Sequence, residues 1–325
     1  MTRLVLVALF AATCAPPAGS SSPVSPSASS AVTPPASASP TEIESGPPTA
    51  SSSAALPSTS DGLPDFPSIW IIVLENHGFD QVVGSADMPY LNGLIDRYGL
   101  AQRSSGVSRP SQPNYFALFS GSTQDVHDND PHDIDAPTVA DQIEASGRTW
   151  KEYAENRPSG CFTGPTASGG RDGDGGYRRK HAPAISFDAI RNDPARCANL
   201  VDLTAFRPDG ADFSLIIPNQ CHAAHDCGLG DADRWLAGFV PRIVDSPTFS
   251  AGGLLIVTFD EDAGNDPGGG HIATVVASPA VAPGFRSDQP HDHYGVLRTI
   301  EDAWGLECLA ESCDARPLDE FFATP

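Results

Sequence analysis

The sequence predicts an α/β fold with a mainly parallel central sheet flanked by helices. Short apolar runs with the length of buried strands alternate along the chain with segments of helical period, a pattern typical of parallel sheets covered by helices. Several of these runs stop abruptly at carboxylate, amide or imidazole side chains, as strands do where an open α/β sheet binds its ligands.

Five apolar runs have the length and composition of buried strands. The first of them, IWIIVL, is six apolar residues in a row, which is typical of a strand covered on both faces. The five runs are, in chain order, Ile69–Leu74, Thr149–Tyr153, Phe213–Ile217, Leu254–Phe259 and Ile272–Ala277.

Helical patterns occupy stretches between and after these runs. The stretch from Cys161 to Tyr177 is rich in Gly, Ser and Asp, has no period, and is predicted to be a loop. The predicted helices are, in chain order, Pro89–Tyr98, Asn114–Phe119, Pro137–Ser146, Asp231–Val244 and His293–Trp304.

Four of the predicted strands run directly into polar side chains suited to a metal ion. Because the carboxyl ends of parallel strands meet at one edge of a sheet, we expect these side chains to form one site. Carboxylate and amide oxygens are ligands for a divalent cation, and the imidazoles of His181, His225 and His271 offer ligands for a second metal or contacts to an anion. The four groups are Glu75-Asn76, Glu155-Asn156, Asn219 with His222, His225 and Asp226, and Asp260-Glu261.

Ser111 is the candidate nucleophile, because it lies between two prolines just before the helical run that starts at Asn114. Backbone N–H groups at a helix start stabilise negative charge, so a hydroxyl there can be held as an alkoxide beside a metal. The local sequence fits a helix cap equally well, because Ser is common before a helix.

Residues 1–64 have the composition of an export segment and a linker. Arg3 precedes an apolar run, Leu4 to Ala12, that is too short to span a bilayer, so residues 1–14 are predicted to be a secretory signal. Residues 15–64 are almost entirely Ser, Pro, Ala and Thr, and we expect them to form a disordered linker. The remaining residues, 65–325, are long enough for one large domain.

Cys14 leaves two modes of export open. A Cys at the end of an apolar signal segment, followed by a flexible tether, is how bacterial lipoproteins are anchored. The box Ala11-Ala12-Thr13-Cys14 lacks the usual Leu and the usual small residue just before Cys. The protein is therefore expected to be extracellular or at the cell surface, either secreted or lipid-anchored at Cys14.

Six further cysteines indicate disulfides, because an even number in an exported protein is typical of an oxidised framework. No C-x-x-C spacing occurs, which disfavours a zinc cluster. Among several allowed pairings, the one that closes the smallest loops is Cys221–Cys227 and Cys308–Cys313, which leaves Cys161–Cys197.

The net charge of −22 disfavours nucleic-acid binding and a basic, lipid-binding surface, and it indicates that some of the acidic residues hold cations.

Six motifs resemble, in their order along the chain, the bacterial phosphoesterase family. That family holds secreted acid phosphatases and bacterial phospholipases C and is related in fold to alkaline phosphatase, so the resemblance implies an alkaline-phosphatase-like fold. It covers Ile69 to Leu306; each motif alone is modest, but six in order are specific. The motifs are ENHGFD, RPSQPNYFALFSG, YRRKHAP, IIPNQCHAAHDC, VTFDED and DHYGVLRTIEDAWGL.

The resemblance implies a role for each matched position. Ser111 is the expected nucleophile, and Arg109, Asn76 and Lys180 are expected to bind the substrate. Arg109 stands where relatives often have His; it can bind phosphate but cannot act as an acid or base near neutral pH. The expected catalytic residues are Ser111, His181 and His225, and the expected metal ligands are Glu75, Asn76, Ser111, Asp260 and Glu261.

The resulting hypothesis is an exported, metal-dependent acid phosphatase that hydrolyses phosphate monoesters through a phosphoserine intermediate. It would need a divalent metal ion of unspecified identity and would act on a small phosphate ester or a phosphoinositide. One alternative is a phospholipase C acting on phospholipid diesters, although such members of the family tend to carry extra C-terminal domains. An alternative of another class is a non-catalytic surface lipoprotein, which would be expected to lose at least one of the ligands or Ser111.

Several other polar residues near the motifs are expected to have structural roles. His77, Asp80 and His293 are expected to brace loops and helix starts, and Asp262 is expected to be solvated. His271 is expected either to support a ligand or to open a strand.

Overall fold

The computed structural model describes residues 63–167 and 176–323. The predicted signal segment, Cys14 and all of the predicted linker except its last two residues lie outside the described residues. Within the two described ranges, no helix combines the length and the apolar character that crossing a membrane requires.

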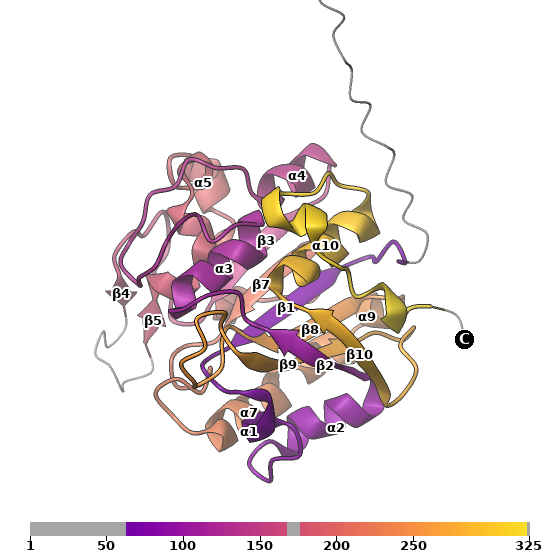
Figure 1. Cartoon of the computed structure of the whole chain (residues 1–325). Helices are drawn as coiled ribbons and strands as arrows, with labels where there is room; N and C mark the ends of the chain where they lie inside the picture. The colour runs from indigo at the N-terminus through magenta and orange to yellow at the C-terminus, as the bar shows by residue number, and fades with distance from the viewer. Residues whose placement is uncertain (1–62, 168–175, 324–325) are drawn as a thin grey trace, which may run out of the picture. The chain divides into compact units, whose positions relative to one another are not determined.

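The centre of the described fold is an eight-stranded sheet in the order β10-β2-β9-β8-β1-β7-β3-β6 (Figure 1). β1 lies between β7 and β8 and is parallel to both, and β3 and β6 continue the parallel part. β9 is antiparallel to both of its neighbours. The strands are β1 (Ile69–Leu74), β2 (Gly99–Ser105), β3 (Trp150–Ala154), β6 (Leu200–Asp202), β7 (Phe213–Ile217), β8 (Leu254–Phe259), β9 (His271–Ala277) and β10 (Phe285–His291), with a separate pair, β4 (Thr166–Ala167) and β5 (Tyr177–Arg178).

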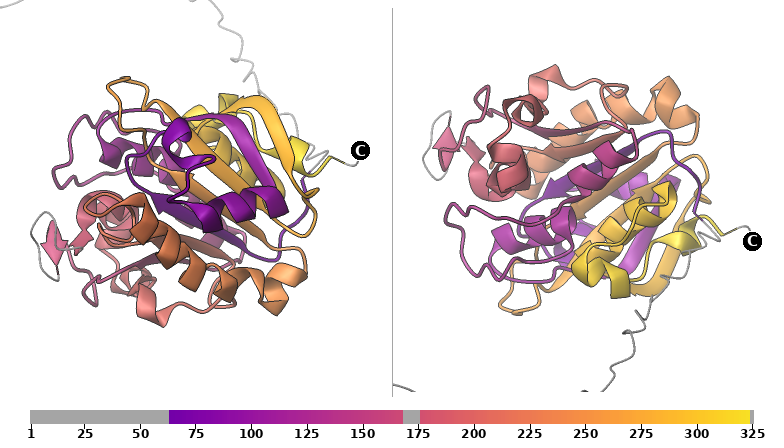
Figure 2. Two further views of the ribbon diagram at one scale, coloured as in Figure 1. Left: turned by 90° about the horizontal axis from the view of Figure 1, so that it is seen from below. Right: turned by 90° about the horizontal axis from the view of Figure 1, so that it is seen from above.

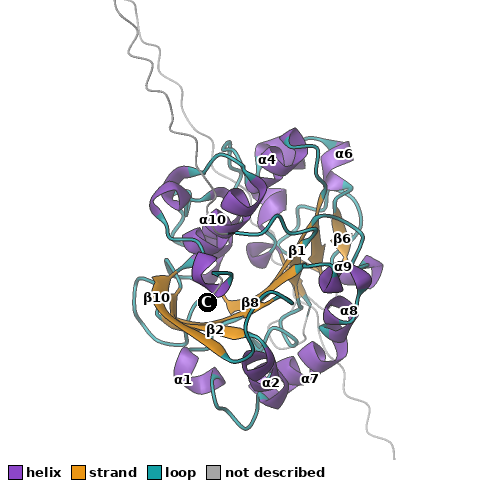
Figure 3. Ribbon diagram, turned by 90° about the vertical axis from the view of Figure 1, so that its right-hand side faces the viewer, coloured by secondary structure: helices purple, strands orange, loops and turns teal. Residues whose placement is uncertain are grey.

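Helices cover both faces of this sheet. α3, α4 and α10 lie over one face, and α1, α2 and α7 over the other (Figures 1 and 3); Figure 2 shows the two faces in turn. The α-helices are α1 (Phe79–Val82), α2 (Pro89–Arg97), α3 (Ser111–Ser120), α4 (Val139–Ala145), α5 (Asp188–Arg191), α6 (Pro194–Cys197), α7 (Leu229–Phe239), α8 (Pro241–Val244), α9 (Pro247–Ser250) and α10 (His293–Trp304), and the 3-10 helices are η1 (Arg179–His181), η2 (Pro183–Ser186), η3 (Leu203–Ala205), η4 (Ala310–Asp314) and η5 (Asp319–Phe321).

Two hydrophobic cores, one on each face, account for the unbroken apolar run of β1. Ile69, Ile71 and Val73 pack into the core under α3, α4 and α10. Trp70 and its alternate neighbours pack into the core under α2 and α7. All six side chains are at most 1% exposed, and each fully buried aliphatic side chain contributes roughly 1.5–3 kcal/mol.

The α/β prediction is confirmed, and all five predicted strands match within one residue at each end. The largest difference is at Thr149–Tyr153, which is displaced by one residue at both ends and corresponds to β3. β2, β6 and β10 were not predicted, and neither were the short helices α1, α5, α6 and α9. β2 and β10 read GLAQRSS and FRSDQPH, and both carry half-exposed or exposed polar residues, so neither contains an apolar run.

The predicted disulfide pairing is confirmed. Cys161 bonds to Cys197 across 36 residues of chain. The other two bonds close loops of six and five residues, Cys221–Cys227 and Cys308–Cys313.

Glu320 ties the C-terminal segment to β10. It accepts hydrogen bonds from Ser287 and from His291, whose Nε2 lies 2.7 Å away, and Arg316 approaches its other oxygen at 3.9 Å. Burial alone would raise the pKa of Glu320, but the hydrogen bonds from His291 and Ser287 outweigh burial and lower it to about 2.

This lowered pKa predicts a contribution to stability that depends on pH. Because the folded state binds a proton less readily than an unfolded Glu of pKa about 4.3, the contribution is present above about pH 4 and is lost as the pH falls towards 2. Glu320→Gln should therefore lower the melting temperature at pH 6, and the difference from wild type should shrink at pH 3. Glu307→Gln, which removes an exposed carboxylate, is the control; equal deficits at both pH values for Glu320→Gln would contradict the assignment.

Candidate active site

The register of the central strands places Glu75 beside Asp260. Leu74 at the end of β1 pairs with Phe259 at the end of β8, so the next residue of each strand emerges at the same edge of the sheet. Both carboxylates are completely buried, and Asn76 N donates to Asp260 Oδ1 at 2.9 Å. Two of the predicted polar strand ends therefore meet, as expected.

Ser111 is the first residue of α3, and its hydroxyl faces this carboxylate pair. Ser111 Oγ lies 3.5 Å from Glu75 Oε2, 3.5 Å from Asn76 Oδ1 and 3.4 Å from Glu261 Oε1. The helix begins three residues earlier than predicted, and Pro110 takes the cap position. The helix-cap interpretation of Ser111 is therefore wrong, because its hydroxyl is directed to carboxylates and lies inside the first turn.

The loop before α3 is held by Asn114. Its Oδ1 accepts the backbone N–H groups of Val107 at 2.9 Å and Ser108 at 3.1 Å, and its Nδ2 donates to Ser108 O at 2.9 Å. These bonds connect the end of β2 to the first turn of the helix. They fix the approach of Ser111 to the edge of the sheet.

The three carboxylates lie in a site that disfavours their charged forms. Burial raises the pKa of Glu75 and, together with the charge of Glu75, raises the pKa of Asp260 well above its usual range. Burial and the neighbouring Asp260 raise the pKa of Glu261 to about 8. Lys180 and Arg109 oppose these shifts without cancelling them, so a bound cation would relieve the remaining repulsion.

Arg109 binds the acidic side of the site. Its Nη1 lies 3.1 Å from Glu261 Oε2, its Nη2 pairs with Asp262, and its Nε donates to Asp266 O at 2.7 Å. The expectation of a solvated Asp262 is wrong, because this carboxylate is ion-paired and only 21% exposed. Arg109 is thus held by Glu261 and Asp262, and its contact with a phosphate stays a prediction.

His181 lies on the opposite side of Glu75. Its Nε2 is 2.9 Å from Glu75 Oε2, and its ring stacks on Tyr115, whose hydroxyl donates to Glu75 Oε1. Burial lowers the pKa of His181 well below its usual value and raises that of Glu75, so burial of both groups works against an ion pair. Tyr115 was not predicted to belong to the site, although it lies in the RPSQPNYFALFSG motif.

His225 lies near His181 on a loop closed by a disulfide. The two ring centroids are 6.2 Å apart, and His225 Nδ1 is 2.7 Å from Asp226 Oδ1. Cys221–Cys227 closes the loop that carries His225. The structure therefore brings together both imidazoles that were expected to face a phosphate.

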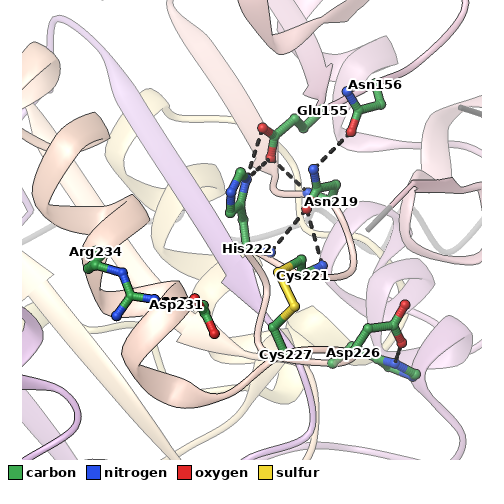
Figure 4. The surroundings of a disulfide bond; sticks show 10 residues. Glu155, Asn156, Asn219, Cys221, His222, Asp226, Cys227, Asp231 and Arg234 are labelled. Carbon is green, nitrogen blue, oxygen red and sulfur yellow. Dashed lines mark hydrogen bonds and ion pairs between the residues drawn. A yellow bond between two sulfur atoms is a disulfide. The ribbon is translucent and has the colours of Figure 1, made fainter. Parts of the chain in front are cut away.

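The polar residues after β3 and β7 form a second cluster that supports this loop. Figure 4 shows Glu155, Asn219 and His222 directed toward one another beside the disulfide, with His222 Nδ1 2.8 Å from Glu155 Oε2. Asn219 Oδ1 accepts the backbone N–H groups of Cys221 at 3.1 Å and His222 at 3.0 Å, and its Nδ2 donates to Asn156 at 2.8 Å. The four polar strand ends thus form two adjacent groups, where we expected one.

Two further histidines brace the site, as predicted. His77 Nδ1 lies 2.8 Å from Glu75 O, and His293 Nε2 lies 2.6 Å from Asp260 O. His271 opens β9, and its Nε2 lies 2.7 Å from Gln102 O. Of its two expected roles, the strand-opening one is confirmed.

The oxygens around Ser111 match a hard divalent cation in type and spacing. Two oxygens that lie at right angles about 2.0–2.6 Å from one ion are roughly 2.8–3.7 Å apart, which includes the separations around Ser111. With the amide of Asn76 reversed, its nitrogen would donate to Glu261 Oε1 at 3.1 Å and to Asp260 Oδ1 at 3.3 Å, so this side chain lies within reach of both carboxylates. In the described part of the chain, no three His, Cys, Asp or Glu side chains form a metal site by themselves. The amide and hydroxyl oxygens of Asn76 and Ser111 would complete the set.

Comparisons with known proteins find phosphatases among the relatives of this chain. The chain is 29% identical over 283 residues to the phosphatidylinositol-3-phosphatase of Mycobacterium tuberculosis, an alignment that covers 84% of this chain and 89% of that protein. It is 28% identical over 265 residues to an acid phosphatase of Aspergillus fumigatus, covering 78% of this chain. It spans only 58% of the fungal protein's length.

A solved protein of the alkaline phosphatase superfamily from Vibrio parahaemolyticus has the same fold. It aligns with a TM-score of 0.51 and 11% identity over 79% of this chain and 72% of its own. The alkaline-phosphatase-like fold that the sequence predicts is therefore confirmed. The model of the phosphoesterase family matches residues 85–307, more than half of the chain, so the protein belongs to the phosphoesterase family.

Proposed function

We propose that the protein is an exported, metal-dependent acid phosphatase that hydrolyses phosphate monoesters through a phosphoserine on Ser111. The fungal relatives named as acid phosphatases support the class of phosphoric monoester hydrolase. The observation that carries the proposal is the Ser111 hydroxyl at the start of α3, within 3.5 Å of oxygens from Glu75, Asn76 and Glu261. In this proposal residues 1–14 are a signal, 15–64 a linker and 65–325 the catalytic domain.

The metal would be held by the oxygens around the serine. Bound there, a divalent ion would neutralise the buried carboxylates and favour the ionised form of the serine hydroxyl. Arg109 would keep Glu261 in position through its 3.1 Å contact. The residues that would hold the ion are Glu75, Asn76, Ser111, Asp260 and Glu261.

Catalysis would proceed in two displacements at phosphorus. Ser111 Oγ loses its proton to water and attacks in line, so that a bond between this oxygen and phosphorus forms and the bond from phosphorus to the leaving alcohol oxygen breaks; the alcohol takes a proton back from water as it leaves. A water molecule then attacks the phosphoserine, which releases phosphate and restores the Ser111 hydroxyl. His181 and His225 hydrogen-bond the phosphoryl oxygens, and Lys180 supplies positive charge to the bound substrate.

A panel of three substrates tests the reaction class. p-Nitrophenyl phosphate, a phosphoinositide monoester and phosphatidylcholine are each assayed with and without chelator. We expect hydrolysis of the monoesters, its loss with chelator, and its return when a divalent metal is added back. Release of diacylglycerol from phosphatidylcholine with no phosphate from the monoesters would indicate a phospholipase C, and an inactive panel would favour a non-catalytic protein.

The mode of export is tested through Cys14. If this Cys carries a lipid, the mature protein should partition into detergent, and Cys14→Ser should release it into the medium. Cys308→Ser with Cys313→Ser provides the control, because it removes cysteines without touching the signal. Wild-type protein already free in the medium would rule out the lipid anchor and leave the proposed reaction unaffected.

A further inference from the structure

A second, positively charged pocket of about 220 Å³ adjoins the candidate active site. It is smaller than the roughly 300–1,000 Å³ of pockets that take a whole ligand, so it fits one part of a substrate. In a chain of net charge −22, the pocket is lined by the sole run of three consecutive cationic residues. The polar residues that line it are Asn129, Thr166, Arg178, Arg179, Lys180, Gln220 and His225.

Three observations connect this pocket to the candidate active site. His225, which lies near His181, also lines the pocket. Asn129 Oδ1 accepts the backbone N–H of Gln112, the residue after Ser111, at 3.1 Å. Lys180 is close enough to the Glu75 carboxylate to oppose the rise in its pKa. A phosphate ester bound at Ser111 would therefore extend into the pocket.

The lining groups have bonding capacity that the described residues leave unused. Within the described ranges, Lys180 forms no hydrogen bond or ion pair. Its interaction with Glu75 is a longer-range electrostatic attraction. Gln220 is 1% exposed, yet its Oε1 has no hydrogen-bond partner among them. Arg179 is 5% exposed; its Nη atoms bind Thr163 O, His132 O and Asp133, but its Nε is unpartnered there.

Buried polar groups of this kind normally have partners, because an unsatisfied one costs free energy. Cationic and amide side chains that line one small pocket match a phosphate that carries neighbouring hydroxyl groups. Phosphate accepts charge-assisted hydrogen bonds from Lys and Arg, and a hydroxyl would donate to the amide oxygen of Gln220.

We propose that this pocket binds a second phosphate group, as monoester or diester, on the leaving group of the substrate. The proposal rests on the proposed phosphatase function and narrows its substrates to compounds with two phosphate groups. Lys180 supplies the principal charge, and Arg179 and Gln220 bind the phosphate and an adjacent hydroxyl.

Matched substrates with one and two phosphates test the subsite. We expect kcat/KM for fructose 1,6-bisphosphate to exceed that for fructose 1-phosphate by at least about 10-fold, well beyond the roughly two-fold gain from having two cleavable groups. Lys180→Gln should reduce this ratio to about 2, whereas Lys180→Arg should retain most of it. Lys151→Gln is the matched control, because Lys151 is the only other lysine of the chain and lies on β3 away from the pocket lining. An unchanged ratio in Lys180→Gln would overturn the proposal.

A binding measurement separates failure of the subsite from failure of the proposed function. Calorimetry with Ser111→Ala protein should show tighter binding of fructose 1,6-bisphosphate than of fructose 1-phosphate, and Lys180→Gln in that background should abolish the difference. If the bisphosphate binds preferentially but is not hydrolysed by wild type, the subsite holds and the phosphatase proposal fails. If both sugar phosphates are hydrolysed and are bound equally, the subsite proposal is wrong and the phosphatase proposal stands.

A further pair of ligands distinguishes a soluble source of the second phosphate from a lipid. Dioctanoyl phosphatidylinositol 3-phosphate carries a diester beside its monoester, and inositol 3-phosphate lacks the diester. A preference for the lipid that Lys180→Gln removes assigns the pocket to a phospholipid diester. A preference confined to the sugar bisphosphate assigns it to a second monoester, and absence of both preferences overturns the proposal.

Discussion

Ser111→Ala is expected to lower kcat by at least ~10³, because a covalent route loses its first step when the hydroxyl is removed. The side chain is 1% exposed and its oxygen faces three ligand oxygens, so the substitution deletes the attacking atom with little change in volume. Steady-state kcat on p-nitrophenyl phosphate and the melting temperature are measured together.

A purely structural role for Ser111 predicts a different result. It would cost about 1 kcal/mol of stability and leave near-normal turnover in the folded fraction. Ser120→Ala is the matched control, because Ser120 is a buried serine at the other end of α3 whose hydroxyl donates to Phe116 O. If Ser111→Ala retains more than about a tenth of wild-type kcat, the phosphoserine mechanism is wrong and water is the nucleophile.

Asp260→Asn and Glu75→Gln should each reduce activity by about 10²-fold or more at low metal concentration, and excess metal should partly restore it. Each change keeps the shape of the side chain but removes one anionic ligand from a buried site, so the expected defect is in metal affinity. The measurement is activity as a function of divalent metal concentration for each variant.

Glu155→Gln is the control for metal rescue, because Glu155 ends the neighbouring strand but contacts His222 and Asn219. Its defect should be insensitive to added metal.

A second measurement uses the melting temperature in chelator. Since burial and the charge of Glu75 raise the pKa of Asp260, Asp260→Asn should be more stable than wild type without metal. Loss of activity with an unchanged metal requirement would contradict the ligand assignment.

The sequence predicted those parts of the fold whose elements are buried on both faces. β1 is a continuous apolar run, and β7 and β8 are interrupted only by Ser214 and Thr258, because the two cores enclose these strands. β2 leads into the Ser111 loop but contains Gln102 and Arg103, whose side chains reach Asp288 on β10. The polar residues of β2 pair with a strand about 185 residues away in the sequence. Local hydrophobic periodicity cannot predict such a pairing.

The residues of the candidate site also differ in whether the sequence could predict them. Glu75 and Asp260 could be predicted as candidates because each follows a recognisable strand end, and Ser111 because it precedes a helical run. The pairing of Arg109 with Asp262 could not, because the two residues are 153 positions apart and meet only through the fold. Glu155 and Asn219 lie apart from the carboxylates around Ser111 because they bind the loop closed by Cys221–Cys227. The path of this loop could not be predicted from the sequence either.

The three disulfides give the two sides of the candidate site different mechanical supports. Glu75 and Asp260 extend from adjacent strands whose positions are set by the hydrogen-bond ladder of the sheet. His181 lies within the ring closed by Cys161–Cys197, and His225 within the ring closed by Cys221–Cys227. Chain made in a reducing compartment would keep the sheet that orients its carboxylates, while both histidine segments would lack covalent closure. In the exported enzyme that we propose, closure of both histidine segments would therefore follow passage into an oxidising environment, and full activity would wait for export.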